Sequence, residues 1–321
     1  MEKYYLAVDI GASSGRHIFL LTGRKRSEYT NATSTQLVNV LTRDWDDEII
    51  EALGLPRHIF RALSQPGQTV GPFTPAIRQA AGFDCQVVLP ATHDTASAVM
   101  AVPAQEEDVL YISSGTWSLM GVENQWPVTS ELSRMENFTN EGGYGQTIRY
   151  LKNIMGLWMI QSARHEWDDA YTFAQLCDLA EEKRGFPSRV DVDDAMFLAP
   201  DSMIGAIQRF CEESRQPVPE SVGQVAAVIY QSLAESYAKT ADKIEGLTGN
   251  RYAAIHIVGG GSNAAYLNKL TAEKSGRTVL AGPAEATAIG NLTAQMIAAG
   301  EMTDLKGARK IIFDSFPIAI Y

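Results

Sequence analysis

Apolar and polar residues alternate most regularly in the second half of the chain. Residues 220–249 carry one apolar face at helical spacing, made of Val222, Val225, Ile229, Leu233, Tyr237 and Ile244. Ser221 and Gln224 stand at capping-box spacing before this face, and Gly246 or Gly249 is expected to end the helix. The pattern predicts one long amphipathic helix.

Short apolar runs alternate with stretches of small residues around this helix. Strands are predicted within 84–90, 252–258 and 277–282, and each is followed by a predicted helix, within 91–102, 262–275 and 285–300 respectively. Strands that alternate with helices are typical of an α/β fold.

Two further segments predict hairpins that close on a glycine turn. Residues 4–10 alternate as a strand, and a second apolar run follows at 17–21. Residues 109–123 repeat the design around a Ser-Ser-Gly-Thr turn. The segments VDIGASS and ISSGTWS match at the glycine and the last serine, which suggests an internal duplication whose two turns face one ligand.

The stretch between the first hairpin and Asp44 fits this scheme poorly. Residues 21–39 form a basic turn and a Ser/Thr/Asn-rich run, and no further strand–helix unit is predicted there. Since a lone hairpin is not a stable domain, there are two possibilities. The hairpin joins the sheet of the C-terminal part, or a segment that should accompany it is missing from the chain.

Composition narrows the class of protein. With 321 residues, 45% hydrophobic, the chain can form two globular domains and is neither disordered nor fibrous. The net charge of -11 disfavours nucleic acid and anionic membranes as partners. There is no signal-peptide pattern and no apolar run of membrane-spanning length, and Cys85, Cys177 and Cys211 are too scattered for a disulfide framework. We therefore expect a cytoplasmic protein with reduced thiols.

The glycine turns are candidate phosphate sites. Successive backbone amides in residues 11–15 and 114–116 could cradle phosphate oxygens, and Asp9 could reach Mg²⁺ through water. Ordinary hairpin turns, and an aspartate that caps its own turn, are the alternatives. Gly259–Gly261 lies between a predicted strand and helix, as nucleotide-binding turns do. It lacks the G-x-G-x-x-G order, so a dehydrogenase is disfavoured.

His93 and Asp94 lie at the junction between a predicted strand and the helix that follows it. An aspartate there is either the N-cap of the helix or a general base that accepts a hydroxyl proton. The other histidines, His17, His58, His165 and His256, are isolated, and no Ser-His-Asp or Cys-His order is present.

In combination, the stretches AVDIGASSGR, EYTNATSTQLVN, ATHDTASAV, YISSGTWSLMG, LKNIMGLWMIQ and IHIVGGGSNAAYLN resemble the FGGY carbohydrate kinases. Within this family the likeness is strongest to members that phosphorylate L-rhamnulose, and it covers the chain from residue 3 onward. The resemblance implies an actin-like, ribonuclease H-like ATPase fold of two domains, with ATP and sugar in the cleft between them.

The resemblance also implies site residues. Asp94 is the expected catalytic base, and His93, Thr95 and Asn153 are expected beside the sugar. Pattern alone would leave Asn153 and Gln161 as polar positions on a helix. The expected contacts to ATP come from Asp9, Gly11, Ala12, Ser13, Ser14, Gly15, Arg16, Ser114, Gly115, Thr116, Gln161, Gly259, Gly260 and Gly261, with Asp9 holding Mg²⁺ through water.

The chain departs from the family in one respect. Most of a domain is missing between the first hairpin and EYTNAT, so the first domain is strongly truncated and the second nearly complete. We expect a remnant hairpin at 1–26, a returning segment with the inter-domain connection at 27–90, and the C-terminal domain at 91–321.

The expected function is ATP-dependent phosphorylation of a ketose, L-rhamnulose, to its 1-phosphate. The expected partner is a small-molecule sugar, and the sequence does not predict the oligomeric state. A catalytically inactive nucleotide-binding remnant and an actin-like or chaperone-type ATPase are the alternatives.

Overall fold

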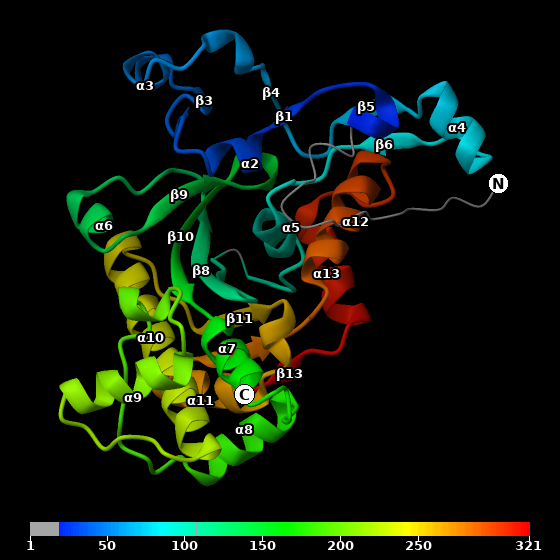
Figure 1. Cartoon of the computed structure of the whole chain (residues 1–321). Coiled ribbons are helices and arrows are strands. Elements are labelled where there is room, and N and C mark those ends of the chain that lie inside the picture. The colour runs from blue at the N-terminus through cyan, green and yellow to red at the C-terminus, as the bar shows by residue number, and fades with distance from the viewer. Residues whose placement is uncertain (1–18, 107) are drawn as a thin grey trace. The chain divides into compact units, whose positions relative to one another are not determined.

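The computed structural model describes residues 19–106 and 108–321, which group into two compact units (Figure 1). Unit 1 consists of Met1–Gln105, Glu123–Leu151 and Glu285–Phe316, and is described from residue 19 onward. Unit 2 consists of Glu106–Val122, Lys152–Ala284 and Pro317–Tyr321. Asp9 and the first glycine turn, residues 11–16, therefore lie outside the described residues.

Unit 1 combines short strands with short helices. β1 pairs in parallel with β4, whereas β2 with β3, β5 with β6, and β9 with β10 are antiparallel. Its strands are β1 (Ser27–Glu28), β2 (Val38–Asn39), β3 (Asp44–Trp45), β4 (Leu63–Ser64), β5 (Thr69–Pro72), β6 (Gln86–Val88), β9 (Thr139–Gly142) and the first half of β10 (Ile148–Met155). Its helices are α2 (Tyr29–Thr33), α3 (Asp47–Ala52), η2 (Arg57–Ile59), α4 (Pro75–Ala81), α5 (Asp94–Met100), α6 (Glu131–Met135), η3 (Tyr144–Gln146), α12 (Ala286–Ala298) and α13 (Leu305–Ser315).

Two of these helices, α5 and α12, pack directly against each other (Figure 1). Their backbones meet at Gly290, where an added Cβ would lie 1.8 Å from the Ser97 carbonyl oxygen. Only glycine permits so close an approach. This contact fixes the helix that begins at Asp94.

Unit 2 contains a mixed sheet and the longest helices. β11 pairs in parallel with β7 and β12, and antiparallel pairs join β7 to β8 and β12 to β13. These strands are β7 (Leu110–Ser114), β8 (Trp117–Asn124), β11 (Ala254–Val258), β12 (Thr278–Ala281) and β13 (Ala319–Ile320). The helices are α7 (Trp158–Glu166), α8 (Phe173–Glu182), η4 (Ala195–Phe197), α9 (Met203–Glu213), α10 (Val222–Thr248), η5 (Gly260–Asn263) and α11 (Ala265–Ser275).

The predicted long helix is α10, and its ends are where the sequence places them. Ser221 and Gln224 form a capping box, and Gly249 ends the helix in the left-handed region. Five of the six residues of the predicted apolar face are buried, Val222 being partly exposed. α10 packs on α8 and α11 (Figure 1).

Two expectations about the N-terminal part are wrong. The run at 17–21 was expected to be a strand, but its described residues belong to a helical turn, 19–22, that closes at Gly23. A short apolar run does not by itself separate strand from helix. The second error concerns residues 21–39, which contain β1, α2 and β2. These elements depend on contacts with distant segments, which local propensity does not reveal.

The α/β class and the second hairpin are confirmed, as are the three free cysteines. Among the described residues, none of the helices combines the length and apolar character needed to span a bilayer.

Replacing Gly290 with Ala is expected to destabilise the protein by about 2 kcal/mol, because the backbones of α5 and α12 must move apart. Gly246 of α10 serves as control, since an added Cβ there meets nothing within 4 Å. Gly246→Ala should stabilise by up to roughly 1 kcal/mol. Urea unfolding measures both values, and equal effects of the two substitutions would contradict the packing argument.

Candidate active site

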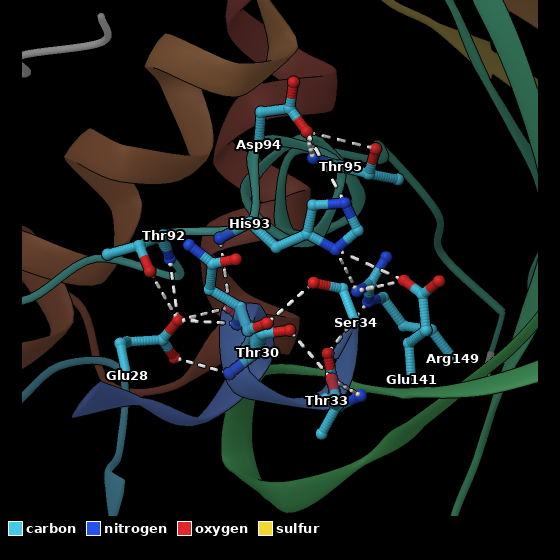
Figure 2. Close-up of polar contacts among 12 residues, drawn as sticks. Glu28, Thr30, Thr33, Ser34, Thr92, His93, Asp94, Thr95, Glu141 and Arg149 are labelled. Atoms are coloured by element: carbon cyan, nitrogen blue, oxygen red, sulfur yellow. Dashed lines mark hydrogen bonds and ion pairs between the residues drawn. The ribbon is translucent and has the colours of Figure 1, made fainter. Parts of the chain in front are cut away.

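The carboxylate of Glu28 joins two distant segments of unit 1 (Figure 2). It caps α2 by accepting the backbone N–H groups of Thr30 at 2.8 Å and Asn31 at 3.0 Å, and the Thr30 hydroxyl at 2.6 Å. Its Oε2 atom also accepts the backbone N–H and the hydroxyl of Thr92, at 3.1 and 2.7 Å. All five donors converge on one buried carboxylate, so the turn before α5 is held against α2.

A second contact continues this connection to His93. The Thr30 hydroxyl accepts the His93 backbone N–H at 3.2 Å (Figure 2). The Thr33 hydroxyl accepts the backbone N–H of Gly142 at 2.9 Å. α2 thus contacts both the turn at His93 and the end of β9.

Asp94 is the first residue of α5, and its side chain is 68% exposed. Its Oδ1 atom accepts the backbone N–H of Thr95 at 2.7 Å and lies 3.7 Å from His93 Nε2. The N-cap position belongs to His93, which makes no side-chain capping bond, so the reading of Asp94 as the N-cap is wrong. One oxygen of the carboxylate is thus fixed by a backbone hydrogen bond, and the side chain is open to solvent.

Behind His93 lies an ion pair that sequence reasoning missed. Arg149 is fully buried in β10; its Nη2 atom donates to Glu141 Oε2 and contacts His93 Nδ1, both at 2.9 Å, and its Nε donates to the Gly142 carbonyl (Figure 2). Burial raises the pKa of Glu141, but the hydrogen bond from Arg149 and its positive charge outweigh burial, and the net pKa is lowered. Glu141 therefore stays a carboxylate.

In unit 2 the second glycine turn meets the triple glycine. Gly259 adopts φ +85°, and an added Cβ there would lie 2.8 Å from the Ser114 carbonyl oxygen. At Gly261 an added Cβ would lie 1.9 Å from Ser114 Oγ. Gly260, in contrast, has nothing within 4 Å of that position. The two predicted nucleotide segments are thus adjacent, and their contact at Ser114 requires glycine at 259 and 261.

The same turn is joined to α7. The carbonyl groups of Gly115 and Thr116 accept the backbone N–H groups of Leu157 and Trp158, at 3.1 and 3.0 Å. The Thr116 hydroxyl lies 3.4 Å from Gln161 Oε1, so Gln161 is beside the turn. Behind it, the hydroxyl of Tyr237 lies 2.6 Å from Ser118 Oγ, and burial raises the pKa of Tyr237 to about 12.

The predicted residues therefore form two groups, one in each unit. His93, Asp94 and Thr95 are together in unit 1, and the segments 114–116, 259–261 and Gln161 are together in unit 2. Asn153 is exposed on β10 of unit 2, a strand and not the expected helix. Across the described part of the chain, no three His, Cys, Asp or Glu side chains gather as a metal site.

Glu28, Glu141 and Arg149 carry no local signal that distinguishes them in the sequence. Arg149 lies in a run of four consecutive buried residues of β10, so its polar character in the sequence gives no sign of its burial. Their partners lie 64 residues away for Glu28 and Thr92, and 56 for Arg149 and His93.

Glu28→Gln is expected to cost roughly 2 to 4 kcal/mol in the free energy of unfolding, because one amide oxygen replaces two acceptors and an N–H₂ group then faces N–H donors. Glu51→Gln, an exposed substitution in α3, should change it by less than about 0.5 kcal/mol. Denaturant titration compares the two variants. A Glu28→Gln protein as stable as Glu51→Gln would refute the anchoring role.

Comparisons with known proteins place this arrangement in a family. A protein of Halalkalibacterium halodurans named rhamnulokinase is 50% identical over 303 residues, which are 94% of this chain and 64% of that protein. The rhamnulokinase of Bacillus subtilis is 43% identical over 308 residues, 94% of this chain and 63% of its own length. The chain thus spans less than two thirds of these relatives.

Solved structures show the same fold. A ligand-bound xylulose kinase from Lactobacillus acidophilus matches with a TM-score of 0.72 at 16% identity, over 96% of this chain and 62% of that one. A Plasmodium falciparum glycerol kinase with ADP matches with a TM-score of 0.70 at 13% identity, over the same shares. The expected actin-like ATPase fold is confirmed.

Residues 17–101 match the N-terminal domain and residues 110–299 the C-terminal domain of one family. The chain belongs to the FGGY family of carbohydrate kinases.

Proposed function

We propose that this chain transfers the γ-phosphoryl group of ATP to a ketose, and that the ketose is L-rhamnulose, phosphorylated at O1. The relatives named rhamnulokinase, 43 to 50% identical over 94% of the chain, support this substrate. The observation that carries the proposal is the exposed Asp94 carboxylate, oriented by Thr95 and His93 at the start of α5.

Asp94 has the role of general base. Its free carboxylate oxygen accepts the proton of the C1 hydroxyl while that oxygen attacks the γ-phosphorus in line, and ADP leaves. His93, Thr95 and Asn153 contact the sugar and orient its C1 hydroxyl. Positioning matters because phosphoryl transfer offers the protein little covalent chemistry to perform.

The nucleotide is held by unit 2. Ser114, Gly115 and Thr116 present backbone groups to the phosphates, and Gly259–Gly261 and Gln161 lie along the rest of the nucleotide. The adjacency of these segments supports one shared ligand, since glycines without side chains leave room for phosphate oxygens. The first glycine turn, Gly11, Ala12, Ser13, Ser14, Gly15 and Arg16, is proposed to complete the phosphate site.

Mg²⁺ is the proposed metal. Bound to a nucleotide, Mg²⁺ keeps several waters and needs only one or two carboxylates, so the described residues, which contain no three-ligand cluster, are compatible with it. Asp9 is the proposed carboxylate, acting through water. When bound, the ion neutralises charge on the phosphate oxygens.

The remaining proposals concern the domain organisation of the chain and its location in the cell. Residues 1–26 are a remnant of the first domain, 27–90 its returning segment and connection, and 91–321 the C-terminal domain. The internal gap in the first domain accords with a chain that spans 64% of its relative. The protein acts in the cytoplasm on a small-molecule sugar.

Asp94→Asn is expected to lower sugar-dependent ADP release from MgATP by about a hundredfold to ten-thousandfold, the range for loss of a general base. Asp44→Asn is a matched control, because Asp44 is also exposed and its Oδ1 also accepts the next backbone N–H, at 2.8 Å. The control should retain wild-type activity.

Three other outcomes would contradict the proposal. ADP release that does not depend on L-rhamnulose indicates an ATPase of the actin or chaperone type. Nucleotide binding without turnover, in folded protein, indicates an inactive remnant. An Asp94→Asn loss below about tenfold removes Asp94 from the role of base.

Gly261→Ala is expected to weaken ADP binding by about tenfold or more, because the added methyl group displaces Ser114 from the turn and overpacking costs roughly 1 to 3 kcal/mol. Gly246→Ala in α10, where an added Cβ also meets nothing within 4 Å and which lies outside the proposed site, should bind ADP as the wild type does. Isothermal titration with ADP compares them. Equal affinity in both variants would mean that the nucleotide does not depend on this turn.

A further inference from the structure

The imidazole of His93 has charged side chains on both sides. Its Nδ1 atom lies 2.9 Å from Arg149 Nη2 and 3.2 Å from Glu141 Oε2, whereas its Nε2 atom lies 3.7 Å from Asp94 Oδ1 (Figure 2). The proton on a neutral imidazole can occupy either nitrogen. Which nitrogen carries it decides whether the ring presents a donor or an acceptor on the side of Asp94.

The chemistry of Arg149 limits the choice. A guanidinium has only donors, so its 2.9 Å contact with Nδ1 is a hydrogen bond only if Nδ1 offers a lone pair. Nη2 carries two hydrogens, and it has two partners at 2.9 Å, Glu141 Oε2 and His93 Nδ1. One hydrogen for each partner satisfies the group completely.

The opposite assignment places Nδ1–H toward Glu141 and leaves two donors facing each other at 2.9 Å. One hydrogen of Nη2 would then lose its partner in the interior. Nη1 is already buried without a hydrogen-bond partner in the described part of the chain, and Arg149 is fully buried. A further unsatisfied donor on the same guanidinium is costly, because a buried group cannot recover its bond from water.

We infer that Arg149 is a positioning residue: held by Glu141 and the Gly142 carbonyl, it keeps His93 neutral with its proton on Nε2. The Nε2–H group then points to the side of Asp94 and can donate to that carboxylate or to a substrate oxygen beside it. Glu141 contributes by fixing Arg149 and offsetting its charge.

The consequence for catalysis rests on the proposed function. A base that removes a hydroxyl proton must be an acceptor at the start of the reaction, and a donor from Nε2 supports Asp94 in that form. A proton on Nδ1 would instead leave only a lone pair on Nε2, so the ring could not donate a hydrogen bond on the side of Asp94. The tautomer itself, however, is a property of the free protein and can be measured without ATP or sugar.

The test is two-dimensional ¹H–¹⁵N NMR of the full chain labelled at histidine, at pH 7 and without ligands. His93→Asn identifies which of the five histidine signals belong to His93. We expect the shift of a protonated nitrogen at Nε2 and of a lone-pair nitrogen at Nδ1. A proton on Nδ1, or on both nitrogens, overturns the inference.

Variants separate the roles of Arg149 and Glu141. In Arg149→Met the donor to Nδ1 is gone, and we expect the proton signal to shift to Nδ1, which then donates to Glu141. Arg309→Met is the matched control, since Arg309 is also a largely buried arginine of unit 1 paired with a carboxylate, Glu123. His93 should keep its Nε2 proton in that control.

If Arg149→Met does not fold, Glu141→Gln supplies the answer. The glutamine oxygen can still accept from Arg149, so we expect His93 to keep its Nε2 proton, whereas a shift to Nδ1 would show that Glu141 and not Arg149 sets the tautomer. The two proposals fail separately. If the wild-type chain has the His93 proton on Nε2 but no kinase activity, the proposed function is refuted. If it has kinase activity but the proton is on Nδ1, this inference is refuted.

Discussion

Unit 1 depends on one buried carboxylate. Glu28 satisfies the first turn of α2 and, through the same two oxygens, holds Thr92 in the turn that leads to Asp94. The short helix α2 depends on such tertiary contacts, because five residues are too few for a helix that stands alone. The exposed position of Asp94 thus follows from a buried group 66 residues earlier in the chain, whereas the ion pair behind His93 determines which atoms of its ring face outward.

In unit 2 the candidate phosphate turn is positioned by close backbone contacts rather than by a buried carboxylate. Gly259 and Gly261 let the backbone of η5 approach Ser114 more closely than any side chain would allow. The carbonyl groups of Gly115 and Thr116 are bound to the start of α7, and the Tyr237 hydroxyl supports Ser118 from the long helix α10. Charged hydrogen bonds position the candidate base in unit 1, and close backbone contact positions the candidate phosphate turn in unit 2.

The sequence predicts unit 2 well and the N-terminal part of unit 1 poorly, for a physical reason. The helix α10 carries its own cap, its own apolar face and its own terminal glycine, so each signal is local. The hairpin of β7 and β8 is equally self-contained. In contrast, the elements between Leu21 and Asn39 depend on hydrogen bonds with Thr92 and Gly142, and no local sequence pattern predicts these distant contacts. The His-Asp-Thr segment was recognisable by its place between strand and helix, but the buried Arg149 and Glu141 behind it were not.

The most direct test of the proposed activity is ³¹P NMR of the full chain incubated with MgATP and L-rhamnulose. C1 of this ketose is a hydroxymethyl group, so a phosphate on O1 couples to two protons. We expect a new phosphomonoester triplet that grows as ADP appears and is absent without the sugar. A doublet would place the phosphate on a different carbon, and inorganic phosphate alone, or no product from folded protein, would contradict the assignment of this chain as a ketose kinase.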